Sequence, residues 1–184
     1  MDNSAHFGLI GLGTMGAALA LNIAEKGYPV AVFNRTASAT DEFMNRAAAE
    51  GVAGRLVPTK SLQDFVAAIT PPRAIVLMVP AGPVVDQQIA ALAPLLQQGD
   101  LIIDAGNANY ADTERRAAEA RDAAHDFMGI GVSGGEEGAR HGPSIMAGGQ
   151  PAQWERLGEM LRAISAKYES EPCAALMGPG GAGH

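Results

Sequence analysis

Short apolar runs alternate with longer segments of helical composition along most of the chain. The apolar runs predict β-strands at residues 6–10, 30–33, 55–58, 74–79, 101–104 and 127–132. The segments between them predict helices at residues 17–26, 37–50, 84–98 and 111–125, with a shorter helix after residue 61. Repeated strand–helix alternation is typical of an α/β fold with a doubly wound, mostly parallel sheet.

The last third of the chain continues this pattern less regularly. Residues 144–149 predict an edge strand, and Pro151 begins a helix that extends to about residue 165. The packing face expected for that helix consists of Trp154, Leu157, Leu161 and Ile164. The helix at 111–125 has a charged face that we expect to be solvated, formed by Asp112, Glu114, Arg115, Arg116, Glu119, Arg121 and Asp122.

A glycine-rich turn lies between the first predicted strand and the first predicted helix. It consists of Gly11, Leu12, Gly13, Thr14, Met15 and Gly16. A Gly-x-Gly-x-x-Gly pattern in this position is typical of a dinucleotide-binding unit, because Gly11 allows a sharp turn, Gly13 admits a pyrophosphate and Gly16 permits close helix packing. The phosphate charge would meet free N–H groups at the positive end of the helix dipole. A structural turn without a ligand is the alternative, since 23 glycines make chance matches common.

The second predicted strand ends in Asn34, Arg35 and Thr36. Enzymes that use NAD usually have an acidic residue here, which binds the ribose 2′-hydroxyl and would repel a 2′-phosphate. This chain instead offers an amide, a guanidinium and a hydroxyl, which suit a phosphate dianion. We therefore predict NADP as the cofactor. The alternative is a solvated turn that caps the next helix.

Two further loops follow strands whose carboxyl ends should lie at the same edge of the sheet, where such folds bind ligands. Asn107 follows the strand at 101–104 and could contact a nicotinamide or a substrate, although an asparagine can also hold its own turn together. Asp104 is expected to be a structural residue at the strand end. The small-residue loop 133–138 could present N–H groups and a hydroxyl to an anionic or polyhydroxylated ligand, or it could be a flexible linker.

The composition excludes several classes of protein. A formal net charge of −7 without a basic run argues against nucleic acid as a partner. The single cysteine, Cys173, rules out an internal disulfide framework and suits a reducing compartment. The four histidines are scattered, so no metal site is predicted. Asp2 and the early glycine turn do not resemble a signal peptide, and no apolar stretch is long enough to span a membrane. We expect a cytoplasmic protein.

Taken together, these motifs resemble the N-terminal coenzyme domain of 6-phosphogluconate dehydrogenase (decarboxylating). The resemblance covers the whole chain, and the stretch Val-Ser-Gly-Gly-Glu-Glu-Gly-Ala at 132–139 is its most specific part. The matching stretches are residues 8–16, 34–36, 81–82, 104–107, 132–140, 142–146 and 180–184.

The resemblance implies a role for each motif. The turn from Gly11 to Gly16 would hold the pyrophosphate of NADP, and residues 34–36 would hold the 2′-phosphate. The nicotinamide would be bordered by Val79, Pro80, Ala81 and Asn107. The substrate 6-phosphogluconate would be contacted by Asn107, Ser133, Gly134 and Gly135, with Glu136 as a further contact near the nicotinamide.

The resemblance also implies a reaction of the pentose phosphate pathway. In the family, a lysine takes the proton of the C3 hydroxyl while hydride passes to NADP. The 3-keto acid then loses CO2, and a glutamate protonates the enediol to give ribulose 5-phosphate. Both residues belong to a helix that follows the Gly-Ala-Gly-His motif, where this sequence ends at His184. We therefore expect residues 1–184 to be one NADP-binding domain, without the family's helical dimerisation domain, that binds cofactor but is inactive alone.

Two positions depart from the family pattern. Many members have lysines where this chain has Ala39 and Pro80, which could weaken the preference for NADP. Arg35 still favours the phosphorylated cofactor. The alternatives are a hydroxyisobutyrate-type β-hydroxyacid dehydrogenase and a non-catalytic NADP-binding module.

Overall fold

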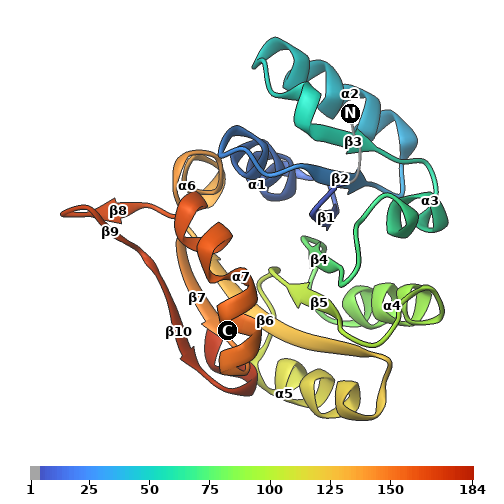
Figure 1. Ribbon diagram of the computed structural model, residues 1–184, viewed down its shortest axis with the longest axis vertical. Coiled ribbons are helices and arrows are strands. Elements are labelled where there is room, and N and C mark those ends of the chain that lie inside the picture. Colours follow the sequence, from blue (N-terminus) through green and yellow to red (C-terminus); the bar gives the residue numbers. More distant parts are fainter. Residues whose placement is uncertain (1–4) are drawn as a thin grey trace.

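A computed structural model describes residues 5–184, and this range contains an eight-stranded sheet with helices on both faces (Figure 1). Neighbouring strands are parallel except for one antiparallel pair, β6 and β7. The predicted doubly wound, mostly parallel α/β fold is therefore confirmed. Asp2, which we weighed against a signal peptide, lies outside the described residues. In spatial order the strands are β10 (Ala174–Gly178), β7 (Ser144–Gly148), β6 (His125–Ser133), β5 (Asp100–Asp104), β4 (Ala74–Leu77), β1 (Phe7–Ile10), β2 (Val30–Phe33) and β3 (Leu56–Pro58).

Successive residues along each central strand contribute to two separate hydrophobic cores. Leu9 and Val76 pack into the core beneath α1, α2 and α7, whereas the adjacent Ile10 and Ile75 pack beneath α3 and α4. All four side chains are fully or almost fully buried. This two-sided burial explains why the strands are apolar at nearly every position. The helices are α1 (Thr14–Glu25), α2 (Ala37–Ala49), α3 (Leu62–Ala67), α4 (Pro83–Leu92), α5 (Tyr110–Glu119), α6 (Gly135–His141) and α7 (Pro151–Ile164).

The order of the sheet reverses between β1 and β4, which lie side by side at its centre. The chain leaves β1 towards α1 on one face and leaves β4 towards α4 on the other face. The loops that follow the two strands therefore diverge and leave a crevice at their carboxyl ends. In doubly wound sheets this is where ligands bind.

The predicted helix at 111–125 is too long at its C-terminal end. It consists of α5, which ends at Glu119, and one 3₁₀ turn, Ala120–Asp122. His125 already pairs with Asp100 as the first residue of β6. The parallel ladder with β5 outweighs the helical composition of these residues, because it satisfies backbone groups along a buried strand.

The glycine-rich segment 133–138 was predicted to be a loop, but Ser133 ends β6, Gly134 is an N-cap residue and residues 135–138 form the start of α6. Gly134 precedes this helix with a φ of 136°, a conformation that favours glycine. The side-chain amide of Asn22 on α1 donates to Ala139 O at 3.0 Å and to Ile164 O at 2.9 Å. This buried asparagine joins α1 to α6 and α7, so tertiary contacts hold a helix that the local sequence does not predict.

The end of the chain also differs from the prediction. The strand at 144–148 is β7, and it does not form the edge of the sheet, because β10 pairs with it on its outer side. A short hairpin, β8 (Lys167–Tyr168) with β9 (Glu171–Pro172), projects from the body between α7 and β10 (Figure 1). A 3₁₀ turn, Gly180–Gly183, follows β10 and packs on β6 and β7.

Candidate nucleotide-binding site

The glycine turn after β1 has the geometry that its sequence predicts. Gly11 has a φ of 100°, and a Cβ there would overlap the carbonyl oxygen of Met78. A Cβ at Gly16 would overlap the carbonyl oxygen of Gly11, so this glycine lets α1 approach the turn. Nothing lies within 4 Å of a Cβ built on Gly13. Gly11 and Gly16 are thus required by packing, whereas Gly13 keeps a surface open.

The N-terminus of α1 faces that open surface. The first N–H bonded to its own turn is that of Ala17, which donates to Gly13 O at 2.8 Å. The N–H groups of Thr14, Met15 and Gly16 precede it and have no acceptor within the helix. Together with the helix dipole they form a surface suited to an anion.

Asn34 at the end of β2 organises the neighbouring loop. Its Oδ1 accepts the N–H of Leu12 at 3.0 Å, and its Nδ2 donates to Thr36 O at 3.2 Å. Both polar ends of the side chain are therefore engaged with the backbone. Arg35 and Thr36 are exposed, and Thr36 also precedes α2 as its N-cap residue.

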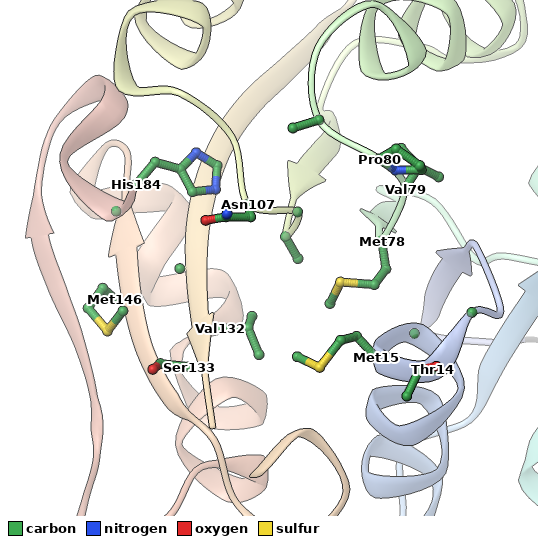
Figure 2. Close-up of a pocket in the computed structure, with 17 residues that line it drawn as sticks. Thr14, Met15, Met78, Val79, Pro80, Asn107, Val132, Ser133, Met146 and His184 are labelled. Carbon is green, nitrogen blue, oxygen red and sulfur yellow. The ribbon is translucent and has the colours of Figure 1, made fainter. Parts of the chain in front are cut away.

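Two cavities lie side by side at the crevice and share Gly13, Met78, Val79 and Pro80. The main cavity measures about 640 Å³ and the side cavity about 280 Å³. Residues from α1, from the loops after β4 and β5, and from β6 and β7 surround the main cavity (Figure 2). The side cavity is lined by Asn34, Arg35, Thr36, Phe33, Val84 and Gln88, among others. This arrangement provides one elongated site with two ends, as a dinucleotide requires.

Asn107 and Ser133 line the main cavity, together with Val79, Pro80 and Ala81 (Figure 2). In the described part of the chain, the side chain of Asn107 makes no hydrogen bond. The neighbouring Asn109 holds the turn instead, because its Oδ1 accepts the N–H of Ala111 at 2.9 Å and caps α5. The amide of Asn107 is therefore available to a ligand.

His184 also lines the main cavity, although the sequence analysis gave it no role. Its Nε2 lies 3.1 Å from Ile130 O and its Nδ1 lies 2.8 Å from Thr113 Oγ1. A carbonyl oxygen only accepts, so Nε2 carries a proton and the ring orientation is fixed. The one sequence feature that could have indicated a role for His184 is the Gly-Ala-Gly-His motif that it ends. Met78, directly after β4, and Met146, in the middle of β7, were missed as well, since apolar residues of a sheet carry no chemical signature.

Three of the predicted substrate residues lie outside the lining of the main cavity. Gly134 is the N-cap residue of α6 and Gly135 is its first residue, directly after Ser133. Glu136 lines a separate cavity between α1, α2 and α6, and its carboxylate lies 3.5 Å from the guanidinium of Arg46. The structure therefore does not bring Glu136 together with Asn107.

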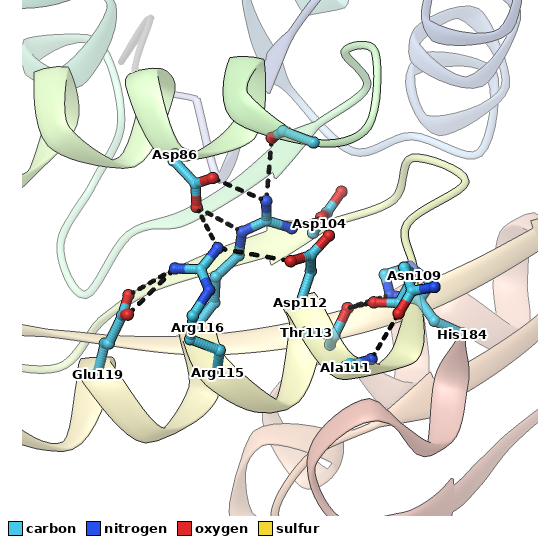
Figure 3. Close-up of polar contacts among 11 residues, drawn as sticks. Asp86, Asp104, Asn109, Ala111, Asp112, Thr113, Arg115, Arg116, Glu119 and His184 are labelled. Carbon is cyan, nitrogen blue, oxygen red and sulfur yellow. Dashed lines mark hydrogen bonds and ion pairs between the residues drawn. The ribbon is translucent and has the colours of Figure 1, made fainter.

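A buried arginine connects the loops that line the site, which corrects the expectation that the charged face of α5 is simply solvated. Arg116 is only 2% exposed. Its guanidinium donates to Gly82 O at 3.0 Å and to both carboxylate oxygens of Asp86, at 2.8 and 3.1 Å (Figure 3). Nη1 lies 3.5 Å from Asp104 Oδ2. Arg116 thus joins the start of α4 to the end of β5.

The pKa values of the two carboxylates beside Arg116, Asp86 and Asp104, are shifted in opposite directions. Hydrogen bonds from Arg116 and then Arg115 lower the pKa of Asp86 to about 2. Burial raises the pKa of Asp104, against the opposing effect of the Gly106 N–H that donates to its Oδ1 at 3.0 Å. Asp104 is completely buried and supports the turn before Asn107, so its predicted structural role is confirmed.

The fold and the site define a dinucleotide-binding domain, with a glycine turn, a helix N-terminus and a two-part crevice at the switch point of the sheet. Residues 6–178 match the family described as the NAD binding domain of 6-phosphogluconate dehydrogenase. The chain belongs to this family.

Relatives with known names support this assignment. The chain is 50% identical over 180 residues to the decarboxylating 6-phosphogluconate dehydrogenase of Synechococcus elongatus, a match that covers 97% of this chain and 37% of the relative. A solved structure of 6-phosphogluconate dehydrogenase from Plasmodium falciparum aligns with a TM-score of 0.92 and 38% identity, and covers 97% of this chain and 38% of that chain. The Mycobacterium tuberculosis 3-hydroxyisobutyrate dehydrogenase aligns less well, with a TM-score of 0.79 and 25% identity over 98% of this chain and 56% of that chain. The chain thus spans about two-fifths of the length of its 6-phosphogluconate dehydrogenase relatives.

Membrane-spanning helices and metal-binding clusters can both be recognised from residues 5–184. None of the helices described there has the length and apolar character needed to cross a membrane. That range also contains no group of three or more His, Cys, Asp or Glu side chains placed to hold a metal ion.

Proposed function

We propose that this chain is the coenzyme-binding domain of an NADP-dependent 6-phosphogluconate dehydrogenase. The observation that carries the proposal is the end of β2, where Arg35 and Thr36 line the side cavity and no acidic residue lines it. The exposed guanidinium of Arg35 suits the 2′-phosphate of NADP, which a carboxylate at this position would repel. The Plasmodium falciparum relative forms a complex with NADP+.

With the 2′-phosphate at Arg35, the positions of the other parts of the cofactor follow. The pyrophosphate would lie at the N-terminus of α1, beside Gly13 and the N–H groups of Thr14 and Met15. The nicotinamide would enter the main cavity between Val79 and Asn107. When bound, NADP+ accepts a hydride from the substrate. Asn34 shapes the phosphate loop through its hydrogen bonds to the backbone, so its contribution to binding is indirect.

The substrate side of the proposal concerns the opposite wall of the main cavity. Asn107 and Ser133 present an amide and a hydroxyl to it, groups that suit a polyhydroxylated acid such as 6-phosphogluconate. Gly134 and Gly135 would add the N–H groups at the start of α6. Proton transfer at C3 and at the enediol would depend on the family's lysine and glutamate, which in its pattern follow the position of His184. These 184 residues by themselves would therefore bind cofactor without turnover.

The proposal is tested by titrating the chain with NADPH and with NADH, and by repeating both titrations on Arg35→Ala. NADPH should bind at least tenfold more tightly than NADH. Arg35→Ala should remove most of this difference and leave NADH binding unchanged, because a charge-assisted hydrogen bond is worth about 1.5–3 kcal/mol. Arg121→Ala is the matched control. Arg121 is exposed and lies just before β6, which is separated from β2 by three strands of the sheet. Equal binding of both nucleotides, or binding of neither, would overturn the proposal.

A further inference from the structure

We propose that Lys60 is a second cationic residue of the site that binds the 2′-phosphate, and that it determines cofactor specificity together with Arg35. This inference rests on the proposed function and extends it to a residue of a different strand–helix connection. Its basis is a third cavity, of about 250 Å³, whose lining includes both Arg35 and Lys60.

The sheet topology places the two residues at the same edge. β2 and β3 are parallel neighbours, with Val32 paired to Pro58. The residue after β3 is held in this register, because Thr59 donates both its N–H and its hydroxyl to Val32 O, each at 3.0 Å. Thr59 is buried and Lys60 is exposed. Lys60 therefore leaves the sheet at a fixed point beside the loop that carries Arg35.

The third cavity continues the nucleotide site. Asn34 and Arg35 line both this cavity and the side cavity, so Arg35 stands between the two. A nucleotide that places its adenosine in the side cavity would direct a group on the ribose towards Arg35 and beyond it towards Lys60. The 2′-phosphate is the group that distinguishes NADP from NAD at this point.

The local charges fit a dianion. Within residues 5–184, neither Arg35 nor Lys60 forms an ion pair, whereas Arg46, Arg115 and Arg140 all do. The acidic residue on the lining of the third cavity is Asp41, on the second turn of α2. Two cations and one anion leave this cavity with a net positive charge, in a protein whose overall formal charge is −7. Such a local excess favours binding of a phosphate.

The test compares Lys60→Met with the unmodified chain, using NADPH and NADH as probes. Methionine keeps most of the side-chain length and removes the charge. Lys60→Met should weaken NADPH binding about three- to tenfold and leave NADH binding unchanged, and the loss should shrink at high salt. Lys167→Met, on the exposed hairpin far from β3 (Figure 1), is the matched control and should change neither affinity. Asp41→Asn should act in the opposite direction and strengthen NADPH binding.

The outcomes separate this inference from the proposed function. If Arg35→Ala abolishes the preference for NADPH while Lys60→Met leaves it intact, the proposed function stands and the role of Lys60 is wrong. If Lys60→Met weakens NADPH and NADH equally, Lys60 does not recognise the 2′-phosphate and the inference also fails. If the unmodified chain has no preference for NADPH, the proposed function fails and this inference fails with it.

Discussion

Two glycines of the nucleotide turn have different roles, packing at Gly16 and ligand access at Gly13, and alanine substitutions can separate these roles. Alanine at position 16 would overlap Gly11 O and force α1 away from β1, at a cost of about 1–3 kcal/mol of stability. Alanine at position 13 meets nothing within 4 Å and suits the local φ of −67°. The same sequence motif therefore contains a packing residue and a ligand-facing residue.

We predict that Gly13→Ala folds with a stability change below about 1 kcal/mol and loses NADPH affinity by more than tenfold, because its methyl group stands where the pyrophosphate approaches. Gly16→Ala should be the less stable of the two variants, because its methyl group overlaps Gly11 O. Chemical denaturation and NADPH titration of both variants check this. A Gly13→Ala variant that binds NADPH as well as the parent chain would contradict the assignment of the phosphate site.

The ion pair between Asp86 and Arg116 makes stability depend on pH in a definite direction. The pKa of Asp86 is lowered to about 2 in the folded chain, from the ordinary value of 3.8 for an aspartate. Its stabilising contribution is thus complete above about pH 4 and is lost as the pH falls through the lowered value. The side chain is 39% exposed, so we expect about 1 kcal/mol, less than the full shift implies.

Denaturant unfolding of Asp86→Asn between pH 2 and 7 tests this contribution. The variant should be less stable than the parent chain at pH 6, and the two curves should converge towards pH 2. Asp122→Asn, on the exposed 3₁₀ turn that follows α5, serves as the control. A stability difference that stays constant down to pH 2 would show that Asp86 acts through packing and not through its charge.

At the scale of elements, a single buried amide links α1 to both α6 and α7. Asn22 is fully buried and donates to carbonyls of both helices. We predict that Asn22→Ala destabilises the chain by about 2–4 kcal/mol, because two buried acceptors lose their donor. The exposed Asn45→Ala should stay within about 0.5 kcal/mol of the parent. Equal denaturation midpoints for the two variants would contradict this role.

The central strands and the first helices could be predicted from sequence because their apolar periodicity is local. The strand at 30–33 and the short helix after residue 61 are where the sequence places them, and the structure shows that Ser61 Oγ caps this helix by accepting the Asp64 N–H at 3.0 Å. α6 and β10 could not be predicted in this way. The sequence of α6 is rich in glycine, and that of β10 has no clear apolar alternation. Each is stabilised by a partner distant in sequence, α6 by Asn22 and β10 by β7.

The candidate site shows the same division. The glycine turn, Arg35 and Asn107 were predicted because a motif or a strand end marks them. Lys60 was missed even though it follows a strand at the same edge, since periodicity does not reveal which strands are neighbours. Glu136 was expected near the nicotinamide, but the fold of α6 turns it towards Arg46. Site residues whose positions depend on contacts between distant parts of the sequence can be identified only from the structure.

At the scale of the whole molecule, the site is locally cationic in a protein of acidic net charge. A formal charge of −7 repels a dinucleotide that carries several negative charges. The helix N-terminus at Gly13 and the cations at Arg35 and Lys60 have to overcome that repulsion over a short distance. Binding of NADPH should therefore depend on a few groups at the carboxyl edge of the sheet and on no other face of the protein.

Backbone amide shifts of the isotope-labelled chain during titration with NADPH test this central claim most directly. The account predicts that the largest shifts fall on the turn from Gly11 to Gly16, on Arg35 and Thr36, and on the loops at Val79 and Asn107. The hairpin at 167–172 should not respond. Shifts concentrated on another face, or no shifts at saturating NADPH, would contradict the assignment of this crevice as the cofactor site.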